Sequence, residues 1–158
     1  MATISAHRQR DTQPLPVQAE NVTRYLVPVG RILFSAIFIM ASLGHFSRHE
    51  INMAAAHGVP IANVFVPASG VIALAGGLSV LLGCWTRLGA WLLIVFLIPV
   101  TFALHNFWAM SDPVQAQTNQ IMFMKNLAMI GAALRIAYFG AGPYSIDRWW
   151  ELRRMGRV

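Results

Sequence analysis

Four long apolar stretches dominate the chain and are separated by shorter polar segments. They cover residues 25–46, 63–83, 88–108 and 121–140. A helix needs about 20 mainly apolar residues to cross the hydrocarbon core of a bilayer, and each stretch reaches that length. The runs are continuous, whereas the strands of a membrane β-barrel alternate between apolar and polar positions over about ten residues. The pattern therefore predicts an all-α membrane protein, a bundle of four transmembrane helices.

The fourth stretch contains two cations, Lys125 and Arg135, and an interfacial helix is the alternative interpretation for it. An interfacial helix carries one strongly polar face, but residues 128–134 are apolar on every side. The two cations also lie near opposite ends of the stretch, where long side chains reach the headgroups while their stems stay in the apolar region. We therefore predict that this stretch also spans the membrane.

The spans belong to one domain, residues 24–147, which two tails flank. Residues 1–23 are polar, contain Pro14 and Pro16, and lack the apolar core of a signal peptide. We expect them to form a disordered cytoplasmic tail, with the first span acting as an uncleaved insertion signal. Residues 148–158 are rich in arginine and are expected to form a second, basic tail.

The distribution of arginine and lysine predicts the orientation of the bundle, because cytoplasmic loops and tails carry the excess of these residues. One side of the membrane would carry only Arg48, with Lys125 at its border. The side that holds both tails is far more basic, so both termini are predicted to be cytoplasmic. The arginines on that side are Arg8, Arg10, Arg24, Arg87, Arg148, Arg153, Arg154 and Arg157.

The composition agrees with burial in lipid and excludes other classes of protein. Hydrophobic residues make up 56% of the chain and charged residues 11%, against about 25% charged residues in a soluble domain, so the lipid bilayer is the expected partner of most of the surface. The net charge is +6, but the basic residues lie in the tails and at span ends, which argues against nucleic acid as a partner. Cys84 is the only cysteine, so an internal disulfide is excluded.

Small residues recur at every fourth position in two of the spans, at Ser69, Ala73 and Gly77 and again at Ala128 and Ala132. This spacing lets helix backbones approach closely in lipid, where packing of small residues stabilises helix pairs. We expect both faces to lie in contacts between helices.

The alternating directions of the spans should bring the end of the first, the end of the third and the start of the fourth to one outer depth. His105 is the leading candidate there, because an imidazole hydrogen-bonds a quinone carbonyl or relays a proton; the alternative is a surface histidine that contacts water. Haem between His45 and His105, or a metal ion held with His57, has no ligand spacing to support it. The candidate ligand-binding residues are His45, His105, Asn106, Trp108, Lys125 and Asn126.

At the opposite end, Arg31, Arg87 and Arg135 are expected near Asp147, and we predict that one of them forms a structural ion pair with it. Every Asp and Glu lies in a tail or loop, so proton transfer through an acid inside the membrane is not supported. The chain also lacks a glycine-rich phosphate loop and the motifs of zinc proteases and serine hydrolases. The sequence therefore assigns no catalytic residue.

Several segments, in this order and spacing, resemble the DoxX family of small bacterial membrane proteins. They are GRILFSAIFIMASLGHF at 30–46, GVP at 58–60, GGLSVLLGCWTR at 76–87, TFALHNFW at 101–108, MKNLAMIGA at 124–132 and GAGPYSID at 140–147. The resemblance covers residues 29–148 and implies a four-helix protein of the bacterial inner membrane. The family is linked to quinone-coupled respiration and the oxidation of sulfur compounds, and some members to oxidative-stress complexes. Many members carry a glutamate where this chain has Ala73.

Three functions are open at this point. The first is a redox-associated protein that holds a quinone at the outer end, with hydrogen bonds from His105, Asn106 and Lys125 and a ring contact from Trp108, and that works with a separate redox partner. The second is a non-catalytic scaffold or subunit that docks soluble partners on its basic tails. The third is a small-molecule carrier or channel, which would need a homo-oligomer to enclose a path.

Overall fold

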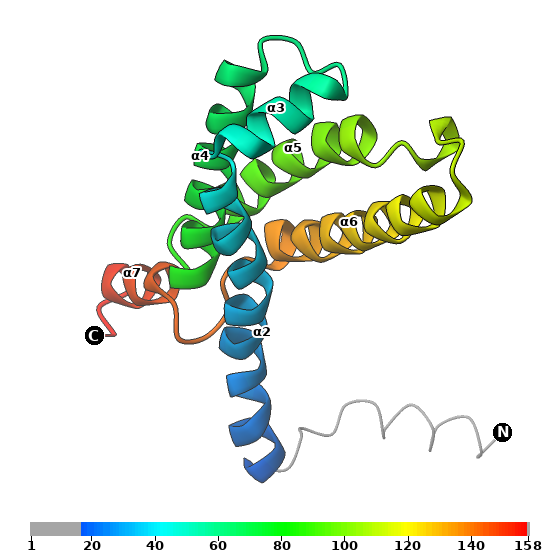
Figure 1. Cartoon of the computed structure of the whole chain (residues 1–158). Coiled ribbons are helices and arrows are strands. Elements are labelled where there is room, and N and C mark those ends of the chain that lie inside the picture. The colour runs from blue at the N-terminus through cyan, green and yellow to red at the C-terminus, as the bar shows by residue number, and fades with distance from the viewer. Residues whose placement is uncertain (1–16, 158) are drawn as a thin grey trace, which may run out of the picture.

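The computed structural model describes residues 17–157 (Figure 1), and residues 1–16 and 158 lie outside the described part. Every regular element among the described residues is helical. The elements are α2 (Val17–Gly44), α3 (Arg48–Ala56), α4 (Ala62–Leu82), α5 (Thr86–Leu104), the short 3-10 helix η1 (Phe107–Ala109), α6 (Pro113–Phe139) and α7 (Ile146–Arg154).

The four predicted spans are confirmed as four helices long and apolar enough to cross a membrane. These segments are Arg24–Gly44, Ala62–Leu82, Thr86–Ala109 and Pro113–Phe139.

Two helices start earlier than the hydropathy pattern predicts. The first span belongs to α2, which begins at Val17, so the tail expected over residues 1–23 is helical in its last part and otherwise lies outside the described residues. The fourth span begins at Pro113 rather than at residue 121. The Asp112 carboxylate accepts hydrogen bonds from the first backbone N–H groups of α6, and proline suits the first turn of a helix.

The helices alternate in direction and pack in the order α2, α4, α5, α6. The α5–α6 hairpin points away from α2, so α2 and α6 lie on opposite flanks of the row (Figure 1). One end of the row is covered by α3 and the other adjoins α7, and these are called the α3 end and the α7 end below. The α4–α5 turn and the α6 C-terminus lie at the α7 end, and the N-terminal part of α2 extends beyond them (Figure 1).

Close contact between α4 and α5 depends on two facing glycines. A Cβ atom on Gly76 would lie 2.9 Å from the Gly89 carbonyl oxygen and 2.8 Å from Leu93 Cδ2. A Cβ atom on Gly89 would lie 3.1 Å from the Gly76 oxygen. The two backbones therefore touch, as small residues permit in membrane helices. The buried core alongside this contact consists of Phe38, Ala73, Val80, Ala90, Leu93, Phe96 and Leu97.

The small residues predicted to lie in helix contacts are only partly found there. Ala73 and Gly77 are buried in α4. Ala128 is exposed, and α6 instead turns Met129 and the fully buried Ala133 inward. The four-residue spacing in α6 therefore does not mark the face that packs on α5.

Candidate functional site

A cavity of about 400 Å³ lies at the α3 end, between the end of α2, α3, and the facing parts of α4 and α5. Its wall is mainly apolar and includes Phe65, Val66, Pro99 and Val100. Four polar side chains complete the lining: His45, Glu50, His57 and Ser69. An apolar enclosure with a few polar groups is typical of a site for a small ligand.

The side-chain hydrogen atoms of His45, His57 and Ser69 form hydrogen bonds with backbone carbonyl oxygens. Nδ1 of His45 lies 2.9 Å from the Ala41 oxygen, and Nδ1 of His57 lies 2.9 Å from the Met53 oxygen. A carbonyl oxygen only accepts hydrogen bonds, so each Nδ1 carries the hydrogen and each neutral ring keeps Nε2 as an acceptor.

Ser69 and Glu50 add further acceptors to the same cavity. The Ser69 hydroxyl donates to the Val66 oxygen at 2.7 Å, which leaves its lone pairs. An ionised Glu50 carboxylate only accepts. The polar part of this cavity therefore offers hydrogen-bond acceptors and few donors.

His45 is held in place by both neighbouring helices. Its ring packs on Phe96 of α5 with the ring centres 5.5 Å apart. On the α4 side it lies against Gly70, where a Cβ atom would come within 2.6 Å of His45 Cβ. A side chain at position 70 would displace the imidazole, so this glycine positions the site.

His105 lies apart from this cavity. Its Nδ1 is 3.0 Å from the side-chain oxygen of Asn119, whose amide nitrogen donates to the Gln115 oxygen at 3.1 Å. His105 follows Phe96, the neighbour of His45, by nine positions, which corresponds to about 13 Å along a helix. His45 lines this cavity and His105 does not, so the two histidines do not share one ligand site.

The other candidate ligand residues lie around the α5–α6 turn. Asn106 caps η1, and Lys125 is exposed with Nζ 3.1 Å from the Met122 sulfur. Asn126 is buried in α6. Trp108 belongs to an aromatic cluster that closes the turn, together with Phe102, Phe107 and Phe123. Of the six candidates, His45 alone lines the cavity at the α3 end.

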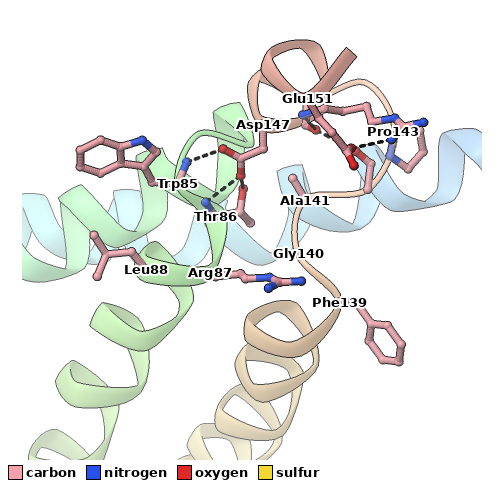
Figure 2. Close-up of a pocket in the computed structure, with 13 residues that line it drawn as sticks. Trp85, Thr86, Arg87, Leu88, Phe139, Gly140, Ala141, Pro143, Asp147 and Glu151 are labelled. Carbon is pink, nitrogen blue, oxygen red and sulfur yellow. Dashed lines mark hydrogen bonds and ion pairs between the residues drawn. The ribbon is translucent and has the colours of Figure 1, made fainter. Parts of the chain in front are cut away.

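At the α7 end, Asp147 ties the segment after α6 to the α4–α5 turn (Figure 2). Its carboxylate accepts hydrogen bonds from Trp85 N at 2.8 Å, from Thr86 N at 3.0 Å and from the Thr86 hydroxyl at 2.8 Å. Its own N–H donates to the Gly83 oxygen at 2.8 Å. Asp147 therefore caps the start of α5 from a distant part of the chain and satisfies backbone groups that a helix end leaves open.

Asp147 forms no ion pair with Arg31, Arg87 or Arg135, in contrast to the prediction. Arg31 is 6% exposed, and its Nη2 donates to the Tyr144 oxygen at 2.6 Å. Its Nε and Nη1 have no hydrogen-bond partner among the described residues. Gly83 has a φ of +67°, and a Cβ atom there would collide with Arg31 Nη1 and Ser145 Cβ. The buried guanidinium thus supports the chain before α7 through a backbone carbonyl.

The two other arginines predicted near Asp147 have separate places. Arg87 lines a second cavity at the α7 end. Arg135 lies over the Phe139 ring, 5.6 Å from its centre. Within residues 17–157 the one ion pair joins Arg148 to Glu151.

The sequence pattern does not indicate the roles of Glu50, Ser69 and Thr86 at these sites. Glu50 and His57 reach the cavity because α3 folds over the bundle, and the signal for α3 was Ser47 followed three residues later by Glu50. Ser69 was read as a packing residue. Thr86 had no signal, because nothing in the sequence indicates which backbone groups Asp147 will meet. Among the described residues, no group of three His, Cys, Asp or Glu side chains is arranged so that it could hold a metal ion.

Comparison with known proteins agrees with this architecture. A family model named DoxX matches residues 26–106. The chain is 32% identical over 122 residues to the inner membrane protein YqjF of Escherichia coli (strain K12), which covers 77% of this chain and 89% of the relative. It is 27% identical over 125 residues to the inner membrane protein YphA of the same organism, covering 78% and 89%. No solved structure was found to match. The chain is a multi-pass protein of the inner membrane and belongs to the DoxX family.

Proposed function

We propose that this protein binds a small aromatic ligand carrying hydroxyl groups, of the quinol class, in the cavity at the α3 end. The observation that carries the proposal is that His45, His57 and Ser69 have committed their hydrogen atoms to backbone carbonyls. The remaining acceptors suit ligand hydroxyl groups, whereas a quinone carbonyl would need donors. The reduced form of the ligand is therefore the better match.

The size and lining of the cavity support the same class of ligand. Its volume of about 400 Å³ falls in the range of about 300–1,000 Å³ usual for small-molecule sites. The apolar wall would contact the ring of the ligand, and the polar side chains would orient its hydroxyl groups.

The proposed role is to hold the quinol for a redox partner. The positive-inside rule places the α3 end on the outer face of the membrane. The chain has no recognisable cofactor motif, so the electrons of a bound quinol would pass to or from a separate protein. This role fits a redox-associated protein better than a carrier, which would need a continuous path.

A set of three related compounds tests the proposal directly. The purified protein in mild detergent is titrated with a short-chain hydroquinone, with the corresponding quinone and with the hydroquinone dimethyl ether. We expect the hydroquinone to bind most tightly, because only it donates to the cavity's acceptors. His45→Ala should weaken its binding by at least tenfold, which is about 1.4 kcal/mol.

Two further histidines make the test specific. His49 lies on α3, is exposed and does not line the cavity, so His49→Ala should bind like the wild type. His105→Ala separates this cavity from an alternative site around His105 and Asn119. Equal affinity for hydroquinone and dimethyl ether, or loss of binding in His105→Ala alone, would contradict the proposal.

If none of the three compounds binds, the two other functions come forward. A scaffold would lose soluble partners when Arg153, Arg154 and Arg157 are replaced by glutamine. A carrier would support flux in liposomes that contain this chain alone.

A further inference from the structure

A second cavity, of about 860 Å³, lies at the α7 end and has no part in the proposed ligand site. The start of α5, the segment that follows α6 and the first turns of α7 surround it (Figure 2). Its charged lining residues are Arg87, Arg148, Asp147 and Glu151. Which of these charges is already balanced decides what the cavity can bind.

Three of the four charged side chains make polar contacts inside the protein. Arg148 and Glu151 form an ion pair with each other. The Asp147 carboxylate accepts three hydrogen bonds from the α4–α5 turn. Arg87 remains, and its guanidinium has no acidic partner among the described residues. Arg87 is therefore the lining cation that has no ion-pair partner among the described residues.

The Arg87 side chain is exposed, and its Nε lies near the backbone of Gly140. Gly140 follows the last residue of α6 with a φ of +79°, a conformation that favours glycine. A Cβ atom at this position would lie 3.5 Å from Arg87 Nε. In Figure 2 the Arg87 side chain extends across the cavity toward this segment. An anion entering beside Gly140 would meet the guanidinium.

The rim of the cavity is apolar where it meets the spans. Trp85 is 65% exposed and Phe139 is 68% exposed, and Leu88 lies beside them on α5. All three occur at or next to the end of a membrane-spanning helix. Tryptophan at such a position is typical of the boundary between headgroups and acyl chains. The positive charge and the apolar rim are therefore at the depth of the lipid headgroups.

We infer that this cavity binds the phosphodiester of an anionic phospholipid, with Arg87 as the residue that contacts the phosphate. A guanidinium matches phosphate oxygens with paired N–H donors. The single negative charge of a phosphatidylglycerol headgroup would pair with the Arg87 guanidinium. The apolar rim would lie against the glycerol and the upper acyl chains, a contact that free phosphate cannot make.

Native mass spectrometry of the detergent-solubilised protein tests this inference. The protein is mixed with equal amounts of phosphatidylglycerol and phosphatidylcholine, and bound lipid is counted after mild activation. We expect the wild type to retain phosphatidylglycerol in at least fivefold preference. Arg87→Gln should lose that preference, and Arg87→Lys should keep part of it, because lysine preserves the charge without the paired donors.

Arg135→Gln is the matched control, since it removes one charge at the same end of the protein but outside the cavity. It should retain the wild-type preference. Equal losses in Arg87→Gln and Arg135→Gln would overturn the inference, because the preference would then reflect net charge alone. Thermal unfolding of each variant identifies misfolding, and if Arg87→Gln is unfolded, Arg87→Lys and Arg135→Gln decide the outcome.

Glycerol phosphate added in excess separates the two sources of the phosphate group. A lipid site should keep its phosphatidylglycerol, because the soluble compound lacks the acyl chains that contact the rim. Complete displacement of the lipid by millimolar glycerol phosphate would overturn the assignment to a phospholipid and point to a soluble phosphate ester.

Discussion

Asp147 serves as the cap of a helix that begins 61 positions earlier in the chain. Most helices take their cap from the residue just before the first turn. In α5 that position is Trp85, which adopts a left-handed conformation and whose side chain makes no capping hydrogen bond. The carboxylate of Asp147 supplies the missing acceptors and places a negative charge at the positive end of the helix.

Asp147→Asn should therefore destabilise the fold, because the amide removes the charge and one of the acceptor oxygens. We expect a loss of about 1–3 kcal/mol in the free energy of unfolding, measured by SDS titration in mixed micelles. Glu151→Gln is the control, since its ion pair with Arg148 is exposed and should contribute about 0–1 kcal/mol. Equal stability losses in the two variants would contradict the capping role of Asp147.

The hydrogen-bond partners of individual residues were the part of the site that the sequence predicted least well. The pattern indicated that Asp147 would meet an arginine, because opposite charges at one end of a bundle suggest an ion pair. The carboxylate instead binds backbone N–H groups, which are present at every residue and leave no mark in a sequence. The sequence also favoured His105 over His45, because the position of His45 beside the cavity depends on Gly70 and on the fold of α3.

At the scale of elements, hydropathy predicted the helices that lipid surrounds and missed those at the membrane boundary. Helices α3 and α7 are short and polar, so no apolar run in the sequence marks their positions. Local signals were nevertheless present: Ser47 and Ser145 each accept a hydrogen bond from the backbone N–H three residues later. The polar first turns of α6 were likewise marked by Asp112 before Pro113.

The contact between α4 and α5 gives a prediction at this scale. Gly76→Ala would bring a methyl group to 2.8 Å from Leu93 Cδ2 and 2.9 Å from the Gly89 oxygen, so the helices must separate. We expect a destabilisation of about 1–3 kcal/mol, measured by thermal unfolding in detergent. Gly131→Ala in α6 has no atom within 4 Å of the added methyl and should leave stability unchanged. A stable Gly76→Ala variant would show that α4 and α5 tolerate a wider spacing.

At the scale of the whole molecule, the two ends of the row of helices differ in their chemistry. The α3 end carries the cavity with hydrogen-bond acceptors. The α7 end carries the arginines and the hydrogen bonds between Asp147 and the α4–α5 turn. Hydropathy and the short turn between α4 and α5 were enough to predict four alternating spans. They could not predict the angle at which the α5–α6 hairpin points away from α2 (Figure 1), because that angle depends on packing.

Orientation in the membrane is the prediction that belongs to the whole molecule. With the α7 end in the cytoplasm, a cysteine in place of Ser111, between η1 and α6, should react with a membrane-impermeant maleimide in intact cells. A cysteine in place of Met155, after α7, should react only after the inner membrane is opened. Both substitutions are made in a Cys84→Ser background. The reverse pattern of labelling would place the α3 end in the cytoplasm.

The hydrogen bonds that Asp147 makes to the α4–α5 turn also have a consequence for biosynthesis. Thr86 leaves the ribosome 61 residues before Asp147, which at about 5–20 residues per second is an interval of about 3–12 s. During that time α4 and α5 can insert as a hairpin, but their turn lacks its acceptor. A nascent chain arrested before residue 147 would therefore present an unfinished turn to membrane proteases, and arrival of the aspartate would mark the end of that vulnerable period.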